Sequence, residues 1–336
     1  MANQETSVKV LESPDQLLQL LFGFQPTRVL LTGFELGVFT ALGDARKPSA
    51  DVARALGTDP RATDRLLNAL VAIGVLQKEG DLFFNTPLAA RFLVEGKPPY
   101  LAGLGHAVHV WNHWNTLTEC VRRGTMVLPR PINERGDQWL APFIAAMHMR
   151  ASQTAPDVVA KIGLGGVGRV LDVGGGSGAY AMAFVRTQQG LRATVFDLPN
   201  VIPLTRQYVE REGLTDRIDF VEGDYLTDEL PPQYDLVFLS QVVHSNAPDE
   251  NVRLIEKAAR VLNLRGQVVI QEFVMSPDRT SPPFAALFAL NMLVATEKGD
   301  TFTEKEIRSW LANAGLSGIE RKETGPHTAI ILGRKL

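Results

Sequence analysis

Four glycines in five positions follow an apolar segment of this chain, and they constrain its fold more than any other feature. The apolar segment is Arg169–Val173, and Gly-Gly-Gly-Ser-Gly follows it up to Gly178. A short apolar run that breaks into glycines is typical of a buried strand that turns into a helix. Glycine tolerates positive φ and lets a ligand lie against main-chain N–H groups, to which the next helix adds its unpaired N–H groups. The sequence therefore predicts a nucleotide-type site in an α/β domain.

A second apolar segment, Ala193–Pro199, contains a carboxylate at Asp197. An acidic residue about 20 residues beyond a glycine turn usually holds the hydroxyl groups of a ribose. The glycines and Asp197 together indicate a ligand that contains adenosine.

The glycine turn also narrows the choice of nucleotide. ATP is disfavoured, because no Lys followed by Ser or Thr comes after Gly178. The spacing of Gly174, Gly176 and Gly178 is Gly-x-Gly-x-Gly, not the Gly-x-Gly-x-x-Gly of a dinucleotide site. Asp172, just before the turn, would repel a pyrophosphate but can support an ammonium group. This combination favours S-adenosylmethionine, which is cationic.

Length and composition are compatible with an enzyme of two domains. The chain has 336 residues, and 45% of them are hydrophobic. A formal net charge of −3 gives no general attraction to nucleic acid or to anionic membranes. The single cysteine, the lack of a leader-like N-terminus and the lack of long apolar runs favour the reducing cytoplasm, with neither nucleic acid nor membrane as a partner.

The first hundred residues have the pattern of a winged helix. Apolar residues recur at helical spacing over 17–42 and again over 61–73, and 74–85 has the pattern of two short strands around a Gly-Asp turn. Such a module can bind DNA, which would make the protein a transcriptional regulator with a ligand-binding domain. However, acidic residues interrupt the arginines of the expected reading helix, and residues 17–24 are more apolar than a solvated helix requires. These features favour subunit pairing.

The segment 104–162 is helical by pattern and rich in aromatic side chains. Phe143 and Met147 are four residues apart, and Trp111 lies in an earlier aromatic cluster. Such a stripe is more often part of a core than of a pocket, although Trp, Phe and Met also suit a flat aromatic ligand. We expect no metal site, because the histidines at 106, 109, 113 and 148 lack the acids or cysteines that would complete a ligand set.

The C-terminal half alternates strands with helices. We expect strands at 217–222, 234–240 and 267–272, a helix at 251–262, and a strand at 328–332 that closes the sheet. This alternation predicts a doubly wound sheet with ligands at the carboxyl ends of its strands. The polar residues expected at that edge are Asp224, Ser240, His244 and Glu272.

On these motifs the chain, from about Phe24 to its end, resembles the class I S-adenosylmethionine-dependent O-methyltransferases of the caffeate, hydroxyindole and bacterial polyketide or phenazine type. The matching segments are 171–178, 196–199, 223–224, 240–251, 269–272 and 299–315. The resemblance implies a winged-helix dimerisation domain at 1–104 and a Rossmann-like methyltransferase domain with its connecting helices at 105–336. It also implies a homodimer that acts in secondary metabolism.

The resemblance further implies a role for each matching residue. His244 corresponds to the general base and Glu272 to the acid that orients it. A planar, mostly apolar acceptor with a reactive hydroxyl group would lie against Trp111, Phe143, Met147, Asn291 and Met292. The implied cofactor-binding residues are Asp172, Gly174, Gly176, Asp197, Gly223, Asp224, Tyr225 and Ser240.

Two segments depart from the family pattern. His244-Ser245-Asn246 stands where the family commonly has His-Asp-Trp. Asp300-Thr301-Phe302, with Glu297 nearby, stands where many members have a Glu followed by Arg-Thr. C- or N-methylation, or chemistry other than transfer, therefore remain alternatives to O-methylation.

Overall fold

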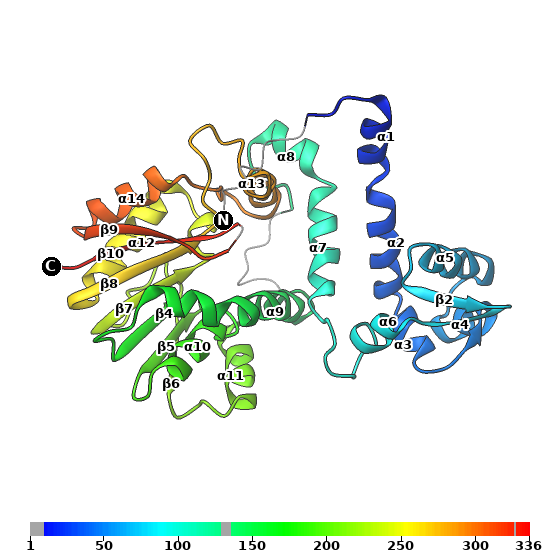
Figure 1. The fold of residues 1–336 in the computed structure, drawn as a ribbon, viewed down its shortest axis with the longest axis horizontal. Coiled ribbons are helices and arrows are strands. Elements are labelled where there is room, and N and C mark those ends of the chain that lie inside the picture. Colours follow the sequence, from blue (N-terminus) through cyan, green and yellow to red (C-terminus); the bar gives the residue numbers. More distant parts are fainter. Residues whose placement is uncertain (1–9, 129–135, 326) are drawn as a thin grey trace, which may run out of the picture. The chain divides into compact units, whose positions relative to one another are not determined.

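The computed structural model describes residues 10–128, 136–325 and 327–336 (Figure 1). The chain forms two compact units, and the division falls between His109 and Val110. The domain boundary expected between residues 104 and 105 stays a prediction. In the part of the chain that is described, no helix combines the length and the apolar character needed to cross a bilayer.

The N-terminal unit contains the predicted helices and hairpin. Its three-stranded sheet has the order β1-β3-β2, and both pairings are antiparallel. The core of this unit includes Phe39, Leu67, Leu70 and Phe83, all of them almost fully buried. The elements are α1 (Pro14–Phe22), α2 (Phe24–Glu35), α3 (Val38–Leu42), β1 (Lys47–Pro48), α4 (Ser49–Leu56), α5 (Pro60–Ala72), β2 (Leu76–Glu79), β3 (Leu82–Asn85) and α6 (Pro87–Phe92).

The second unit is built on a seven-stranded sheet with the order β6-β5-β4-β7-β8-β10-β9. The strands from β6 to β8 in this order are parallel, and β10 runs antiparallel to both of its neighbours. The chain starts at β4, moves outward to β6 and then returns to the other side of β4, so the strand order reverses between β4 and β7. Ligands of open α/β sheets bind at such a reversal. The strands are β4 (Arg169–Val173), β5 (Arg192–Asp197), β6 (Ile218–Glu222), β7 (Tyr234–Ser240), β8 (Leu262–Glu272), β9 (Ser317–Glu323) and β10 (Ala329–Arg334).

Helices cover both faces of this sheet (Figure 1). Successive residues of a strand therefore enter different cores, as β7 shows: Leu236 and Phe238 belong to one apolar cluster, Val237 and Leu239 to the other. Burial on both faces explains why the central strands are almost continuously apolar. One face carries α9 (Asp137–Ile162), α10 (Ala179–Thr187) and α11 (Ile202–Arg211), and the other carries α12 (Pro248–Arg260) and α14 (Glu304–Asn313); the remaining helices are α7 (Leu104–Trp114), α8 (Leu117–Arg123) and α13 (Pro283–Ala295).

The prediction that the strand at 328–332 closes the sheet is wrong. This strand is β10, which lies inside the sheet, and β9 forms the edge beyond it. The sequence of β9, Ser-Gly-Ile-Glu-Arg-Lys-Glu, is largely charged and gives little apolar alternation. Charged side chains are common on edge strands because they discourage pairing with other chains. Because of these charges, apolar patterns in the sequence do not predict this strand.

The packing of β7 makes a testable prediction about stability. Phe238 is fully buried, and its ring lies 5.3 Å from that of Phe184 and 4.9 Å from that of Tyr180. Phe238→Ala should lower the free energy of unfolding of this unit by about 3–5 kcal/mol, because it removes apolar contacts and leaves a cavity. Chemical denaturation followed by circular dichroism measures this. Leu264→Ala is the control, since Leu264 is 78% exposed; equal midpoints for the two variants would contradict the packing described.

Candidate active site

The glycine turn after β4 is held in a backbone conformation that only glycine adopts easily. Gly174, Gly176 and Gly178 have φ values of 66°, 57° and 74°. A Cβ on Gly174 would lie 2.9 Å from Cγ2 of Val242, so a side chain there would collide with the protein. A Cβ on Gly176 would instead meet nothing nearer than Cδ1 of Ile144 at 4.0 Å. The middle of the turn therefore faces open space that a ligand can fill.

Two carboxyl groups, the buried Asp172 and the half-buried Asp197, hold this turn in place. Asp197, at the end of β5, accepts hydrogen bonds from the N–H groups of Gly176 at 2.7 Å and Leu198 at 2.8 Å. Asp172, at the opposite side of the turn, accepts one from the N–H of Ala181 at 3.2 Å. Burial raises the pKa of Asp172 to about 7 and that of Asp197 to about 6. Each oxygen of a carboxylate has two lone pairs, so Asp197 can still accept hydrogen bonds from a ribose.

The residues after β6 lie at the same end of the sheet. The N–H of Gly223 donates to the carbonyl of Asp197 at 3.0 Å. A Cβ on Gly223 would lie 2.5 Å from Cζ of Phe196, so any larger residue at this position would collide with that ring. Asp224 caps the turn that follows by accepting from the N–H of Leu226 at 2.9 Å. Its carboxylate therefore has lone pairs left at the expected cofactor site.

Tyr225 lies beside the glycine turn. Its ring atom Cε1 is 3.9 Å from the position that a Cβ on Gly174 would occupy. The hydroxyl of Tyr225 donates to Oδ1 of Asn246 at 3.1 Å, and burial raises the pKa of Tyr225 above its usual value. At the end of β7, the hydroxyl of Ser240 donates to Oε1 of Gln271 at 2.8 Å, which leaves its oxygen as an acceptor.

A buried histidine–glutamate pair completes this edge of the sheet. His244 lies in a short 3-10 turn, η2 (Val243–Ser245), and Nδ1 of His244 is 2.9 Å from Oε1 and 3.0 Å from Oε2 of Glu272. His244 is 8% exposed and Glu272 only 1%. Because a carboxylate accepts, the hydrogen-bond network assigns the proton to Nδ1 and leaves Nε2 with a free lone pair. The arrangement can take up a proton at Nε2 and stabilise the resulting charge.

The segment that departs from the family pattern near Asp300 holds the backbone of His244. The N–H of Asp300 donates to the carbonyl of His244 at 3.0 Å. A Cβ on Gly299 would lie 2.5 Å from that same carbonyl oxygen. The carboxylate of Asp300 accepts from the N–H of Thr301 at 2.7 Å and from Arg279 at 3.3 Å. Asp300 therefore fixes the loop around His244 through its backbone, whereas its carboxylate caps the next residue.

The predicted acceptor-binding residues lie on three helices. On α13, Oδ1 of Asn291 accepts from Nε1 of Trp114 at 2.9 Å, and the buried Met292 lies 3.3 Å from the Cβ position of Gly299. Phe143, on α9, stacks on Trp139 with 5.0 Å between the ring centroids. Trp111 on α7 and Met147 on α9 are half-buried. The structure thus brings Met292 next to the His244 segment, and the joint role of the five residues stays a prediction.

Sequence reasoning missed the part that His148 has in this site. It considered His148 only as a metal ligand, but Nδ1 of His148 lies 2.9 Å from the hydroxyl of Ser177 in the glycine turn. The imidazole also stacks on Tyr208 with 4.2 Å between the centroids, and burial lowers the pKa of His148. Among the residues that the structure describes, no group of three or more His, Cys, Asp and Glu is placed to hold a metal ion. No local sequence signal marks this contact, because His148 and Ser177 are 29 residues apart and lie in different elements.

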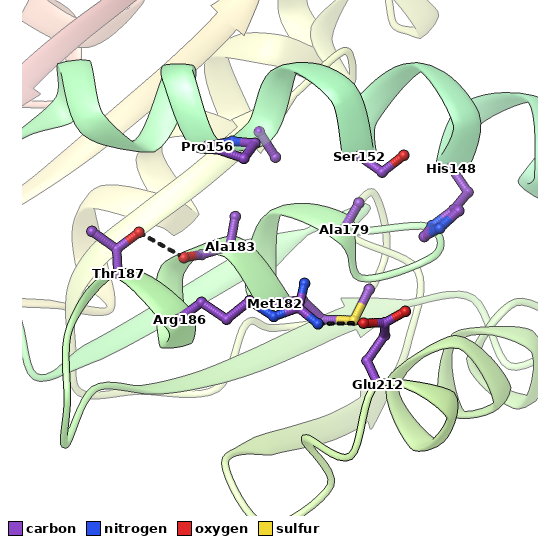
Figure 2. A pocket seen from close by; sticks show the side chains of 10 residues that line it. His148, Ser152, Pro156, Ala179, Met182, Ala183, Arg186, Thr187 and Glu212 are labelled. Carbon is purple, nitrogen blue, oxygen red and sulfur yellow. Dashed lines mark hydrogen bonds and ion pairs between the residues drawn. The ribbon is translucent and has the colours of Figure 1, made fainter.

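A groove of about 220 Å³ is lined by His148 and other residues of α9 and by residues of α10, two helices that pack against each other (Figure 2). An ion pair between Arg186 and Glu212 lies along it. Met182 and Ala183 contribute apolar surface from α10. The groove therefore adjoins the glycine turn, because Ala179 follows Gly178 and His148 contacts Ser177.

The raised pKa values of Asp172 and Asp197 predict that these two groups contribute less stability as the pH rises. A carboxyl group whose pKa is higher in the folded than in the unfolded chain stabilises the fold fully below its unfolded pKa of 3.8, and this contribution is lost as the pH rises through the folded pKa. The loss begins near the unfolded pKa of 3.8 and is complete above about pH 7 for Asp172 and about pH 6 for Asp197. The melting temperature of Asp172→Asn should therefore fall less than that of the unaltered protein between about pH 5 and about pH 8.

Thermal unfolding at several pH values measures this difference. Asp216→Asn is the matched control, because Asp216 is exposed at the surface. If the melting temperatures of Asp172→Asn and the unaltered protein change in parallel with pH, Asp172 does not titrate as described.

Comparison with known proteins agrees with this geometry. The family model of the O-methyltransferase dimerisation domain matches residues 18–95, and that of the O-methyltransferase domain matches residues 131–317. The 3-hydroxy-5-methyl-1-naphthoate 3-O-methyltransferase of Streptomyces sahachiroi is 34% identical over 314 residues, which cover 91% of this chain and 90% of the relative.

Two solved structures are also similar to this one. The structure described as PigF with SAH has a TM-score of 0.88 and 26% identity, and the match covers 96% of this chain and 100% of that one. Human N-acetylserotonin methyltransferase in complex with SAM has a TM-score of 0.82 and 27% identity, with 98% of this chain and 99% of that one covered. The chain belongs to the family of S-adenosylmethionine-dependent O-methyltransferases.

Proposed function

We propose that this protein transfers the methyl group of S-adenosylmethionine to a hydroxyl group of a small aromatic acceptor, with His244 as the general base. The observation that supports this most directly is the buried His244–Glu272 pair, held at the same sheet edge as the glycine turn. An imidazole with one nitrogen bound to a carboxylate and the other free is suited to accept a proton from a phenol.

The residues around the glycine turn fit the cofactor. Open space above Gly176 leaves room for the ligand, and Asp197 has lone pairs for two ribose hydroxyls. In its ionised form, the carboxyl of Asp172 favours a cation in its neighbourhood. When bound, the cofactor supplies a methyl group on a positively charged sulfur. The residues that we propose to hold it are Asp172, Gly174, Gly176, Asp197, Gly223, Asp224, Tyr225 and Ser240.

The chain's own part in the reaction is positioning and proton transfer. As the acceptor oxygen forms its bond to the methyl carbon and the bond from carbon to sulfur breaks, Nε2 of His244 takes the hydroxyl proton. Glu272 keeps the imidazole in the correct tautomer and balances the positive charge that develops on it. Holding the acceptor oxygen in line with the methyl group and sulfur supplies much of the remaining rate enhancement.

The acceptor is expected to be planar and mostly apolar. We assign its site to Trp111, Phe143, Met147, Asn291 and Met292, which offer aromatic, thioether and amide surfaces on α7, α9 and α13. The Streptomyces relative is named for a hydroxynaphthoate, a fused aromatic ring with one reactive hydroxyl group. Aromatic and Met side chains bind such flat rings through large apolar faces. The cytoplasmic location expected from the sequence stays a prediction.

The first test of this proposal concerns the base. His244→Ala should lower the turnover of a phenolic acceptor by about 10² to 10⁴, the usual contribution of a general base. Glu272→Gln should cost less, because it keeps the shape of the side chain and loses only its charge. Turnover is measured against pH, and isothermal titration with S-adenosylmethionine serves as the control for cofactor binding. If His244→Ala keeps most of its activity near neutral pH, the acceptor is an already ionised group, a carbon or a nitrogen.

We further propose that the N-terminal unit joins two copies of the chain. The match to a dimerisation domain supports this. So does α1, whose residues are all described and none buried: Leu17, Leu20 and Leu21 share one helical face and are 58%, 69% and 60% exposed. Apolar groups gathered in this way mark an interface in most proteins.

Replacing Leu17, Leu20 and Leu21 together by Glu should give a monomer, because three charges would then lie in the apolar interface. Light scattering coupled to size-exclusion chromatography measures the mass. Leu264→Glu is the control, because Leu264 is also exposed but belongs to the methyltransferase unit. A dimer that survives the triple change, or salt-sensitive and sequence-selective DNA binding by the full chain, would refute pairing through α1 as the role of this face.

A further inference from the structure

A chain of hydrogen bonds through two buried asparagines joins Tyr225 to the turn that carries His244. The hydroxyl of Tyr225 donates to Oδ1 of Asn246 at 3.1 Å, and Nδ2 of Asn246 donates to Oδ1 of Asn251 at 3.0 Å. Nδ2 of Asn251 then donates to the carbonyl of Val243 at 2.9 Å, the first residue of η2. Asn246 is 2% exposed and Asn251 is fully buried, so water does not compete for the two bonds that Asn251 makes, whereas Tyr225 is half-buried.

The direction of this chain of bonds is fixed by its last member. The carbonyl of Val243 can only accept, so Asn251 must present its amide nitrogen to Val243 and its oxygen to Asn246. Asn246 must then present its nitrogen to Asn251, which leaves its oxygen for the hydroxyl of Tyr225. Both amides therefore have one consistent orientation, and each link depends on the one before it.

We propose that Asn246 and Asn251 are positioning residues for His244, and that the hydroxyl of Tyr225 is the third member of this set. The inference rests on the proposed role of His244 as the base. Tyr225 then has two separable parts: its ring faces the glycine turn, and its hydroxyl supports the turn that carries the base. Nothing in the family assignment gives either asparagine a role.

The local structure of η2 explains why such support is needed. The turn has three residues and no side-chain cap. Glu272 fixes the imidazole of His244, and Asp300 fixes its carbonyl. The carbonyl of Val243 accepts from Nδ2 of Asn251 at 2.9 Å and, at the longer distance of 3.3 Å, from the backbone N–H of Asn246, so Asn251 supplies the shorter of its two contacts. Breaking one link would leave buried polar groups unpaired, and the turn would shift to pair them. A shift of a fraction of an ångström at a base that must meet the acceptor proton is enough to slow transfer.

Tyr225→Phe tests the inference because it keeps the ring and deletes only the hydroxyl. We expect the affinity for S-adenosylmethionine, measured by isothermal titration, to change by less than about twofold, and kcat on a phenolic acceptor to fall about tenfold. Tyr234→Phe is the matched control. Its hydroxyl also donates to a side-chain oxygen, Oγ1 of Thr194 at 3.0 Å, but Tyr234 begins β7, at the end away from Ser240. This control should keep its kcat.

The same change in the His244→Ala background separates positioning from other effects. If the hydroxyl acts through His244, Tyr225→Phe lowers kcat in the unaltered protein and has no further effect once His244 is gone. An equal loss in both backgrounds, or no loss in either, would overturn the inference while leaving His244 as the base. Full turnover by His244→Ala alone would instead show that His244 is not the base, and the inference would then fail as well.

Asn246→Leu provides a second variant that breaks the chain of bonds in its middle. Leucine has a similar volume and no polar atoms, so this change removes two links together. It should lower kcat at least as much as Tyr225→Phe does, with cofactor affinity again kept, and adding Tyr225→Phe to it should cause no further loss. Additive losses in the double variant would show that the two residues act independently and would contradict the proposal.

Discussion

The hydrogen bond from the N–H of Gly176 to the carboxylate of Asp197 is the contact on which the site depends. It joins the glycine turn after β4 to the end of the neighbouring strand β5, and the carbonyl of Asp197 in turn holds Gly223 after β6. One residue thereby aligns the loops after three parallel strands. The cost is a half-buried carboxyl group whose partial loss of solvent raises its pKa to about 6.

The part of the site that contains His244 is held in a different way. His244 lies on a short turn instead of a helix or strand, so its position depends on contacts from elsewhere: the carboxylate of Glu272 at the ring, the N–H of Asp300 at the carbonyl, and Asn251 one residue earlier. These contacts come from β8, from the loop after α13 and from α12. A turn held from three directions is rigid even though its own hydrogen bonds are few.

Particular elements show what could be predicted from sequence and why. The central strands and the glycine turn were found because burial on both faces makes the strands apolar, and because a positive φ requires glycine. The carboxyl ends of parallel strands lie at one edge of a sheet, so the sequence alone predicts that Asp224, Ser240 and Glu272 lie together. The edge strand β9 was missed, because its charged sequence lacks the alternation by which strands are recognised.

The sequence by itself determined the nature of the cofactor site, since glycines, a ribose-binding acid and the absence of a phosphate motif are local features of the chain. Only the tertiary structure decided which distant residues support that site. The hydrogen bond between His148 and Ser177 and the one from Asn251 to the carbonyl of Val243 both form only when their elements pack together. Neither contact leaves a periodic or spaced signal, because a hydrogen bond between buried side chains requires only that two elements pack together. The same holds for Asp300, whose N–H donates to the carbonyl of His244. In the sequence, Asp300 is only a departure from the family pattern.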